Sequence, residues 1–488
     1  MPNPHPPTNQ PAKILSHWAW VLFIGIAWFC TPGFSAFAGA AADHGVLRVT
    51  GSRRYLEHAD GTPFFYLGDT AWTLFSRANR EEADRYLSNR AAKGFTVVQA
   101  VVLAPEGGLT VPNPYGDLPL IDGDLSQPND AYFRHVDYIV SKAAGFGLYV
   151  GMLPSWGAYW KQDGNHPRGL FTPEKARQYG RFLGQRYREK PIIWILGGDQ
   201  DVTTPADRAV VDALAAGLKE GDGGTHLITY HPRGPGLSSD SLGDAAWLDF
   251  NMVQSSHGAH DHDNGLFTEH DYALSPARPT LDGEPRYETM PVGFYFSDIG
   301  RLDRFDDYDV RQAAYWSLLA GACGHTYGHN NVWQFWQPGR GRAIWASQPW
   351  YDSLDAAGAF QMGYVRRLFE AYPYNQLIPN NAALVDAPRE GGAKVRAAVA
   401  RDGSFAFIYS PRGEKFTVDK RIFRSPRLRE IWYDPRYGSA YVVHITETHG
   451  FQTFTPPTSG RGQDWILIID DAARNFKLPG ADTDAVVK

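Results

Sequence analysis

Cysteine is almost absent from this sequence of 488 residues, which contains only Cys30 and Cys323. Two cysteines allow one disulfide at most, so a scaffold held together by disulfide bonds is excluded. Charge is also scarce at the start of the chain, where Lys13 is the only Lys, Arg, Asp or Glu among the first 38 residues. An apolar run at residues 18–30 and an Ala-x-Ala pattern ending at Ala38 predict a signal peptide (residues 1–38) that is cleaved after Ala38. Cys30 would leave with this peptide, and Cys323 would have no partner.

Long apolar runs and an excess of positive charge are missing as well. The apolar run has 13 residues and is too short for a stable membrane anchor. At 43% hydrophobic residues the chain is also too polar for a multi-span membrane protein. A net charge of −6 argues against nucleic acid as the partner. We therefore expect a periplasmic or extracellular protein without a stable membrane anchor, present as a monomer or small homo-oligomer.

Aromatic residues, by contrast, are abundant: they make up 14% of the chain and include 15 Trp. Such a content in an acidic protein is common among sugar-binding proteins, whose flat rings stack on the C–H faces of sugars. A large aromatic core explains the same composition equally well. Composition alone therefore leaves both interpretations open.

Strand-like apolar runs alternate with helix-like segments over most of the chain. Eight such runs lie at residues 64–67, 95–103, 148–153, 191–196, 226–230, 248–253, 279–281 and 325–327. This repetition predicts an α/β fold, a (β/α)₈ TIM barrel over residues 39–375 that begins with a short β-rich entry. A doubly wound open sheet would need a glycine-rich loop after its first strand, and none is present there. Shorter alternating runs predict an antiparallel β-sandwich at residues 376–475, followed by a tail at 476–488.

Two carboxylic acids follow predicted strands at the edge where a barrel carries its active site. Asp199 ends the string Gly-Gly-Asp after the fourth strand, and Glu284 ends Leu-Asp-Gly-Glu at the seventh. A retaining glycosidase needs such a pair about 5–5.5 Å apart, one protonated to release the leaving oxygen and one ionised to attack the anomeric carbon. Asp199 could instead cap the next helix, but Thr204, followed by proline, is the better helix start. Asp282 and Glu288 compete with Glu284.

Polar and aromatic side chains follow the other predicted strands at the same edge. Aromatic rings in such loops can form the wall of a sugar subsite. Ordinary structural explanations stand beside this one, since Asp69 can cap a helix and the tryptophans can belong to the core. We predict substrate contacts for Asp69, Trp72, Trp156, Trp160, His257, His325 and Trp333. Trp156, Trp160 and Trp333 should then be partly exposed around a pocket that contains the two carboxylic acids.

A histidine-rich stretch at residues 255–263 raises the alternative of a metal site, because His257, His260 and His262 stand beside Asp261 and Asp263. Three histidines and two aspartates could bind zinc. Metal-dependent barrel hydrolases usually carry a His-x-His pair after the first strand, where this chain has Asp-Thr-Ala. The spacing also differs from that of a calcium loop. We therefore expect no metal and no cofactor.

Four short strings give the chain a resemblance to a known family. They are YLGDTAWTLF at residues 66–75, RAAKGFTVVQ at 90–99, IIWILGGD at 192–199 and LDGE at 281–284. With these strings, residues 45–375 resemble the apiosidase-like glycoside hydrolases, grouped as glycoside hydrolase family 140. The resemblance implies a (β/α)₈ barrel with Asp199 as the acid/base and Glu284 as the nucleophile. It also implies a C-terminal β-sandwich of the type labelled collagen-binding, although nothing in that sequence points to collagen.

The resemblance further implies a substrate such as apiose in the side chains of plant rhamnogalacturonan II, but loop changes can remodel such a pocket. We therefore predict more broadly a secreted, retaining glycoside hydrolase that cleaves O-glycosyl bonds in plant or microbial polysaccharide side chains. A non-catalytic carbohydrate-binding protein and a metal-dependent barrel hydrolase are the alternatives.

Overall fold

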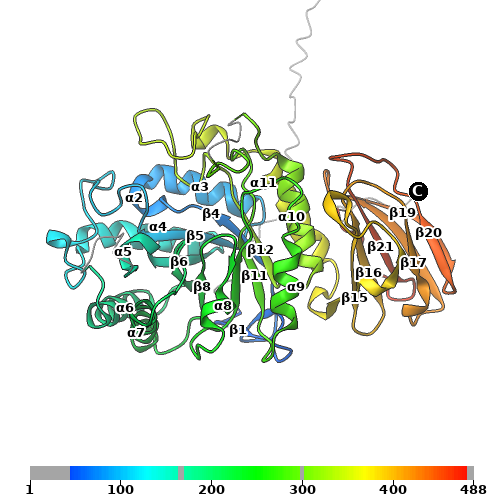
Figure 1. The fold of residues 1–488 in the computed structure, drawn as a ribbon, viewed down its shortest axis with the longest axis horizontal. Coiled ribbons are helices and arrows are strands. Elements are labelled where there is room, and N and C mark those ends of the chain that lie inside the picture. The colour runs from blue at the N-terminus through cyan, green and yellow to red at the C-terminus, as the bar shows by residue number, and fades with distance from the viewer. Residues whose placement is uncertain (1–43, 163–169, 297–301, 481–488) are drawn as a thin grey trace, which may run out of the picture. The chain divides into compact units, whose positions relative to one another are not determined.

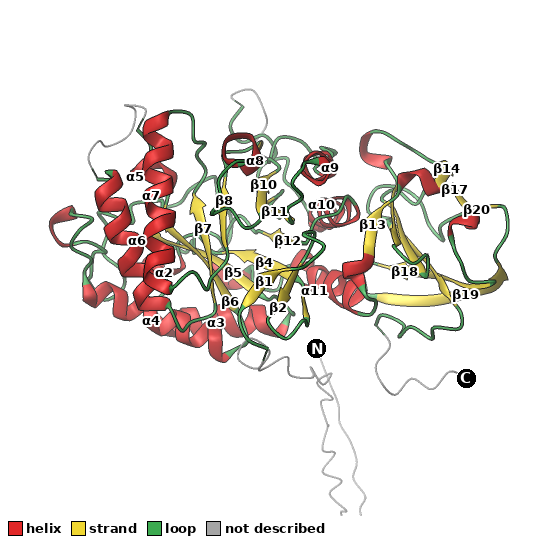
Figure 2. Cartoon of the chain, turned by 90° about the horizontal axis from the view of Figure 1, so that it is seen from below, coloured by secondary structure: helices red, strands yellow, loops and turns green. Residues whose placement is uncertain are grey.

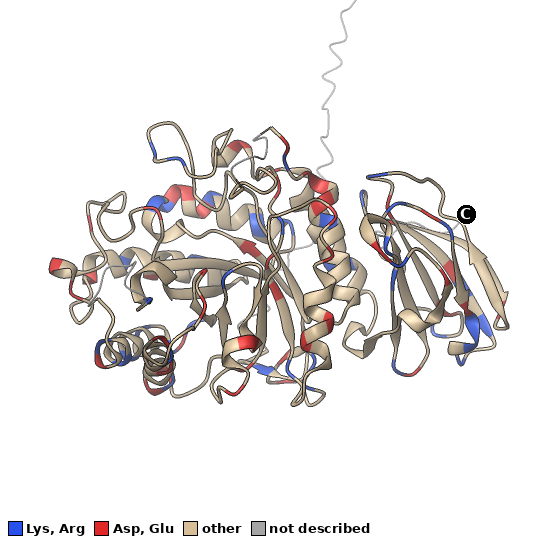
Figure 3. Cartoon of the chain, in the orientation of Figure 1, with Lys and Arg blue, Asp and Glu red and all other residues tan. Residues whose placement is uncertain are grey.

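The structure is a computed structural model that describes residues 44–162, 170–296 and 302–480 (Figures 1 and 2). The predicted signal peptide at residues 1–38 lies outside this part of the chain. An α/β domain between Leu47 and Glu370 precedes a β-rich C-terminal domain between Leu377 and Asp471. Figure 3 shows both signs of charge spread over the two domains. No helix within the described ranges is long and apolar enough to cross a membrane.

Eight parallel strands form the centre of the α/β domain. In chain order they are β4 (Tyr66–Thr70), β5 (Val97–Leu103), β6 (Tyr149–Ser155), β7 (Ile192–Gly197), β8 (Ile228–His231), β10 (Asn251–Gln254), β11 (Thr280–Glu284) and β12 (Gly324–Tyr327). Hydrogen-bonded neighbours follow the order β8-β7-β6-β5-β4-β12-β11-β10, and the short antiparallel β9 (Gly236–Leu237) is added beside β10. Because β12 pairs with β4, the sheet curls until its last strand lies beside its first. The antiparallel strands β1 (Leu47–Val49), β2 (Leu56–His58) and β3 (Pro63–Phe64) precede it.

The two ends of this curled sheet meet between β8 and β10. There the Asp249 N–H donates to the carbonyl of Ile228 (2.9 Å), and the Thr229 hydroxyl donates to the carbonyl of Phe250 (2.7 Å). Within the described ranges no regular ladder joins the two strands. The predicted α/β class is therefore confirmed as a curled, mostly parallel sheet with helices, while complete closure into a (β/α)₈ barrel stays a prediction.

Helices connect the strands and lie outside the sheet (Figure 2). They are α2 (Leu74–Arg77), α3 (Arg80–Ala92), α4 (Asp130–Gly145), α5 (Gly157–Trp160), α6 (Pro173–Tyr187), α7 (Pro205–Asp222), α8 (Ser238–Leu242), α9 (Gly265–Ala273), α10 (Asp307–Leu319) and α11 (Ala357–Glu370). The start of α7 matters for the site, because the Thr204 hydroxyl accepts a hydrogen bond from the Asp207 N–H (3.1 Å). Thr204 thus caps α7, and Asp199 is left free of that role.

The C-terminal domain consists of antiparallel strands in two sheets around their own core. The first sheet has the order β13 (Leu377–Pro379), β15 (Arg396–Ala400), β16 (Phe405–Ser410), β21 (Trp465–Asp471), β18 (Arg427–Asp434) and β19 (Ser439–Glu447). The second contains β14 (Leu384–Asp386), β17 (Phe416–Asp419) and β20 (Phe451–Phe454). The predicted antiparallel β-rich domain is confirmed.

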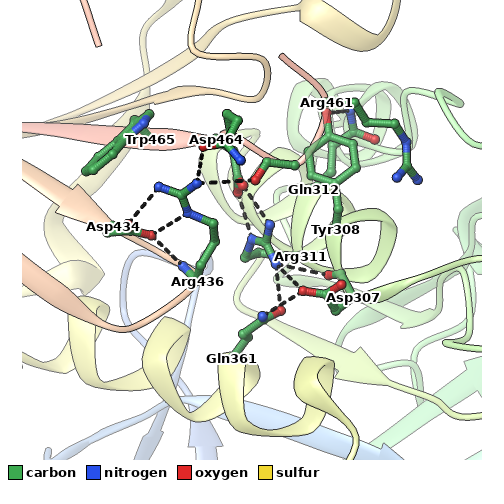
Figure 4. Close-up of polar contacts among 12 residues, drawn as sticks. Asp307, Tyr308, Arg311, Gln312, Gln361, Asp434, Arg436, Arg461, Asp464 and Trp465 are labelled. Carbon is green, nitrogen blue, oxygen red and sulfur yellow. Dashed lines mark hydrogen bonds and ion pairs between the residues drawn. The ribbon is translucent and has the colours of Figure 1, made fainter. Parts of the chain in front are cut away.

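The two domains share apolar and polar contacts. At the end of α11 the ring of Phe369 packs edge-on against Phe407 with centroids 5.4 Å apart. Arg311 of α10, only 1% exposed in its side chain, donates to both carboxylate oxygens of Asp464 at 2.8 and 2.6 Å (Figure 4). A buried guanidinium needs such a partner, because an unpaired charge inside a protein is strongly destabilising.

Candidate active site

Asp199 lies in a strained loop directly after β7. Gly197, Gly198 and Asp199 all have left-handed backbone angles, with φ of 94°, 82° and 62°. A Cβ at Gly197 would lie 2.2 Å from the carbonyl oxygen of His231, so this first position admits only glycine. The Asp199 N–H donates to Nδ1 of His231 (3.2 Å). A non-glycine residue in this conformation is uncommon and costs free energy, which favours a functional reason for Asp199.

Glu284 ends β11 and is buried, with 6% of its surface exposed. Two imidazoles hold its carboxylate, one at each oxygen. Nε2 of His231 lies 2.8 Å from Oε2, and Nε2 of His257 lies 3.1 Å from Oε1. The His231 contact has the distance of an ion pair but not the angle of a good hydrogen bond, so it is a polar contact between the two groups. Both imidazoles face the carboxylate and stabilise its charged form.

The surroundings push the pKa values of the two carboxyl groups apart. Burial and the negative charge of Glu284 raise the pKa of Asp199 from 3.8 to about 6. Burial alone would raise the pKa of Glu284, but the contacts of His231 and His257 overcome it and lower that pKa to about 2. Near pH 5 one carboxyl is therefore protonated and the other ionised. This division is the one that an acid and a nucleophile require.

His231 connects the two acids. Its Nδ1 accepts the Asp199 N–H, so the ring proton lies on Nε2 and faces Glu284. His231 was not predicted from the sequence, because the fifth apolar run ends at residue 230, one position before it. A histidine at the end of a barrel strand was the available signal.

Tyr287 was missed as well. Its ring packs edge-on against His257 with centroids 4.8 Å apart. Burial and the nearby charge of Glu284 raise the pKa of its hydroxyl well above the ordinary value. Gly328 makes room for the ring, since a Cβ there would lie 2.2 Å from it. Sequence spacing gives no sign of this contact.

Trp72 and Trp156 form an aromatic cluster with His231. The rings of Trp72 and Trp156 are 5.6 Å apart, and Trp72 meets His231 edge-on at 5.4 Å. Trp72 is 2% exposed, whereas Trp156 is partly exposed. Of the predicted sugar contacts, His257 thus binds Glu284 itself, while Trp72 and Trp156 lie beside His231, which contacts both Asp199 and Glu284.

The other predicted contacts are buried and have protein partners. Asp69 has no exposed surface and binds Arg90 (2.7 Å) and the Tyr86 hydroxyl (2.5 Å). His325 is bound to the hydroxyl of Ser317 at 2.9 Å. Their contacts with substrate stay untested predictions.

The expected partial exposure is wrong for Trp160 and Trp333, which are 2% and 6% exposed. The Trp160 indole N–H turns inward and donates to the carbonyl of Gly197 (2.6 Å), while that of Trp333 donates to Asn330 (3.2 Å). A ring that is only 2% exposed offers almost no surface to a sugar, and this also holds for Trp72; Trp160 instead supports the loop that carries Asp199.

Three side chains of the histidine-rich stretch at residues 255–263 bind other residues of the protein. His257 contacts Glu284, His260 contacts Asp309 (3.0 Å), and Asp263 is paired with Arg396 and Lys394. Within the described ranges, no group of three or more His, Cys, Asp or Glu is placed to hold a metal ion. These side chains therefore give no support to the zinc alternative.

The chain is similar to known proteins along most of its length. The family model described as "Apiosidase-like, catalytic domain" matches residues 50–376, and the model "Putative collagen-binding domain of a collagenase" matches residues 378–470. A solved structure described as "Glycoside hydrolase" is 34% identical with a TM-score of 0.81, over 89% of this chain and 98% of that one. A glycoside hydrolase family 5 structure from Bacteroides vulgatus ATCC 8482 is 32% identical with a TM-score of 0.81, over 89% and 95%. No curated protein matches the chain.

Proposed function

The chain belongs to the apiosidase-like family of glycoside hydrolases, and on that basis we propose that it is a retaining glycosidase with Asp199 as acid/base and Glu284 as nucleophile. The resemblance carried by the four sequence strings is confirmed at the level of this family. The observation that best supports the two roles is the separation of pKa values, about 6 for Asp199 and about 2 for Glu284. An acid must hold a proton at the pH at which the nucleophile has lost its own.

In the first step the ionised carboxylate of Glu284 forms a bond to the anomeric carbon. The bond from that carbon to the leaving oxygen breaks, and the proton of Asp199 moves to this oxygen. In the second step a water molecule attacks the same carbon, gives a proton to Asp199 and releases Glu284. Two inversions at one carbon give net retention.

His231 and His257 serve the first step by keeping Glu284 ionised and fixing its orientation. His231 also accepts a hydrogen bond from the backbone N–H of Asp199, so one imidazole ring helps to fix the positions of both carboxyl groups. The partly exposed Trp156 beside buried Trp72 supports a sugar subsite next to this pair.

We further propose that the substrate is a polysaccharide side chain that carries a pentose such as apiose, or a related sugar. We also propose that the protein acts in the periplasm or outside the cell. The export part of this proposal predicts that the secreted protein begins at Gly39. N-terminal sequencing of protein recovered from the periplasm or medium tests it, and a retained N-terminus contradicts it.

A panel of aryl glycosides of pentofuranoses and hexoses identifies a working substrate. Proton NMR of the first product then reports whether the anomeric configuration is retained, and inversion contradicts the mechanism. Glu284→Gln should lose several orders of magnitude in turnover, because no other group replaces the nucleophile.

Glu288→Gln is the matched control for Glu284→Gln. Glu288 is also a buried glutamate, but it binds the Tyr327 hydroxyl (2.6 Å) and the Gly358 N–H (3.1 Å). We expect turnover within a few-fold of wild type in this control. Near wild-type turnover in Glu284→Gln would refute the assignment.

A further inference from the structure

The loop at residues 255–264, here called the histidine loop, runs from the end of β10 to the start of α9 and carries His257. Both its ends bind one atom of β11. The Ser255 hydroxyl and the Asn264 side-chain amide donate to Oδ2 of Asp282 at 3.0 and 2.7 Å. Asp282 is fully buried and precedes Glu284 by two residues. The ends of the loop are therefore fixed to the strand that carries the proposed nucleophile.

The second half of the histidine loop is held by the C-terminal domain. Arg396 of β15 donates to both oxygens of Asp263 at 2.8 and 2.9 Å, and Lys394 binds the same carboxylate at 2.7 Å. Arg412 binds Asp261 at 2.7 Å. The backbone also approaches closely here, since a Cβ at Gly392 would lie 2.1 Å from an oxygen of Asp261.

Arg396 is the central group of this attachment. Its side chain is completely buried and also contacts Glu269 of α9. A buried guanidinium requires its acidic partners, and the acids in turn require the guanidinium. The pairing thus fixes the position of Asp263 more firmly than an exposed ion pair could.

The loop has a conformation that needs outside support. Ser256, directly before His257, has a left-handed φ of 95°. A serine in this region costs free energy and persists only where its surroundings impose it. The Ser256 hydroxyl binds Tyr295 (2.7 Å), the Gly293 N–H donates to the carbonyl of His257 (2.8 Å), and Arg286 and Asp309 bind the loop at His260. The C-terminal domain adds its restraints at Asp261 and Asp263.

We propose that the C-terminal domain is a positioning part of the active site: Arg396 and Lys394, acting through Asp263 and the histidine loop, hold His257 against Glu284. The inference rests on the proposed role of Glu284. It gives this domain a function in catalysis instead of in the capture of a separate ligand. Arg396 and Lys394 are positioning residues, because they act through His257.

The acidic limb of kcat/KM against pH measures the linkage, because it reports the ionisation of Glu284 in the free enzyme. Loss of the His257 contact removes a stabilising partner of the carboxylate and moves the limb to higher pH. The titratable groups that surround Glu284 are His231 at the end of β8, Asp199 after β7, Asp282 on β11, His257 and Tyr287. Among these, only His257 belongs to the histidine loop.

The experiment compares full-length variants on one aryl glycoside. His257→Ala sets the full size of the shift, which we expect to be about one pH unit or more. Arg396→Met and Lys394→Met should move the limb in the same direction by part of that amount. Arg311→Met is the matched control, since it removes an equally buried arginine from the same domain interface without contact to the histidine loop.

An acidic limb at the wild-type position in folded Arg396→Met and Lys394→Met overturns the proposal. An equal shift in Arg311→Met also overturns it, because a general loosening of the interface would then be the cause. If Arg396→Met does not fold, Lys394→Met decides alone. Glu284→Gln is measured in parallel: full activity there refutes the proposed function itself, whereas lost activity with unmoved limbs refutes only the linkage.

Discussion

Replacing Asp199 with asparagine should make the folded protein more stable at neutral pH while it removes the proposed acid/base. Asparagine has nearly the same shape and tolerates the left-handed backbone that Asp199 adopts at φ 62°. The substitution therefore removes the charge and little else. The resulting change in the free energy of unfolding measures how strongly the ionised Asp199 destabilises the folded protein.

The size follows from the pKa. Burial and the charge of Glu284 raise the pKa of Asp199 from 3.8 to about 6. At about 1.36 kcal/mol per pKa unit, the ionised form destabilises the fold by up to about 3 kcal/mol. Below pH 3.8 both the folded and the unfolded chain carry the proton, and the difference vanishes. Between pH 3.8 and 6 the unfolded chain releases the proton first, so stability is lost as pH rises.

Thermal unfolding of wild type and Asp199→Asn between pH 4 and pH 7 provides the assay. For the roughly 330 residues that match the catalytic family model, 3 kcal/mol corresponds to a Tm increase of about 4 °C at pH 7. The gain should shrink toward zero near pH 4. Asp201→Asn is the control, because Asp201 lies in the same loop and accepts the Arg233 N–H (3.0 Å). No gain at pH 7, or an equal gain at both pH values, would refute the reasoning.

Three further predictions concern activity and binding. Activity should fall as pH rises through about 6, because Asp199 then ionises. With substrates that have activated leaving groups, Asp199→Ala should not show this alkaline fall in activity. An unchanged fall in this variant would exclude Asp199 as the acid. Trp156→Ala should raise KM more than it lowers kcat, because Trp156 is expected to contact the sugar. Trp160→Ala should lower the free energy of unfolding by about 3–5 kcal/mol, because Trp160 is buried. Melting curves and Michaelis constants of both variants show which tryptophan belongs to a subsite and which to the core. Dialysis against EDTA should leave kcat/KM unchanged, and a loss restored by zinc would support a metal-dependent hydrolase instead.

Periodicity was sufficient to predict much of the fold. The predicted runs at residues 95–103 and 191–196 correspond to β5 and β7, because long apolar strands stand out in a short stretch of sequence. Short elements could not be predicted one by one: β9, β14 and β17 have only two, three and four residues. Such pieces depend on neighbours that are distant in sequence.

The same distance limits what the sequence says about the site. Asp199 and Glu284 were predicted from strand ends, which is local information. The contact of His231 with Glu284 joins residues on different strands. Trp160 follows a strand like Trp156, yet its position on α5 turns its indole inward to Gly197. The partner of Asp263 lies 133 residues further along the chain, at Arg396.

The apolar contact between Phe369 and Phe407 and the ion pair of Arg311 with Asp464 mean that the two domains must evolve together, because each side of the interface needs matching residues on the other. A recombination event that exchanged the C-terminal domain for that of a distant relative would have to bring matching interface residues with it. A truncated protein that ends after α11 would expose the apolar ring of Phe369 and leave Arg311 without Asp464, and the exposed apolar surface favours aggregation. Expression of the α/β domain alone is therefore expected to give insoluble protein, and library designs for this enzyme should place their crossover points elsewhere than at the domain junction.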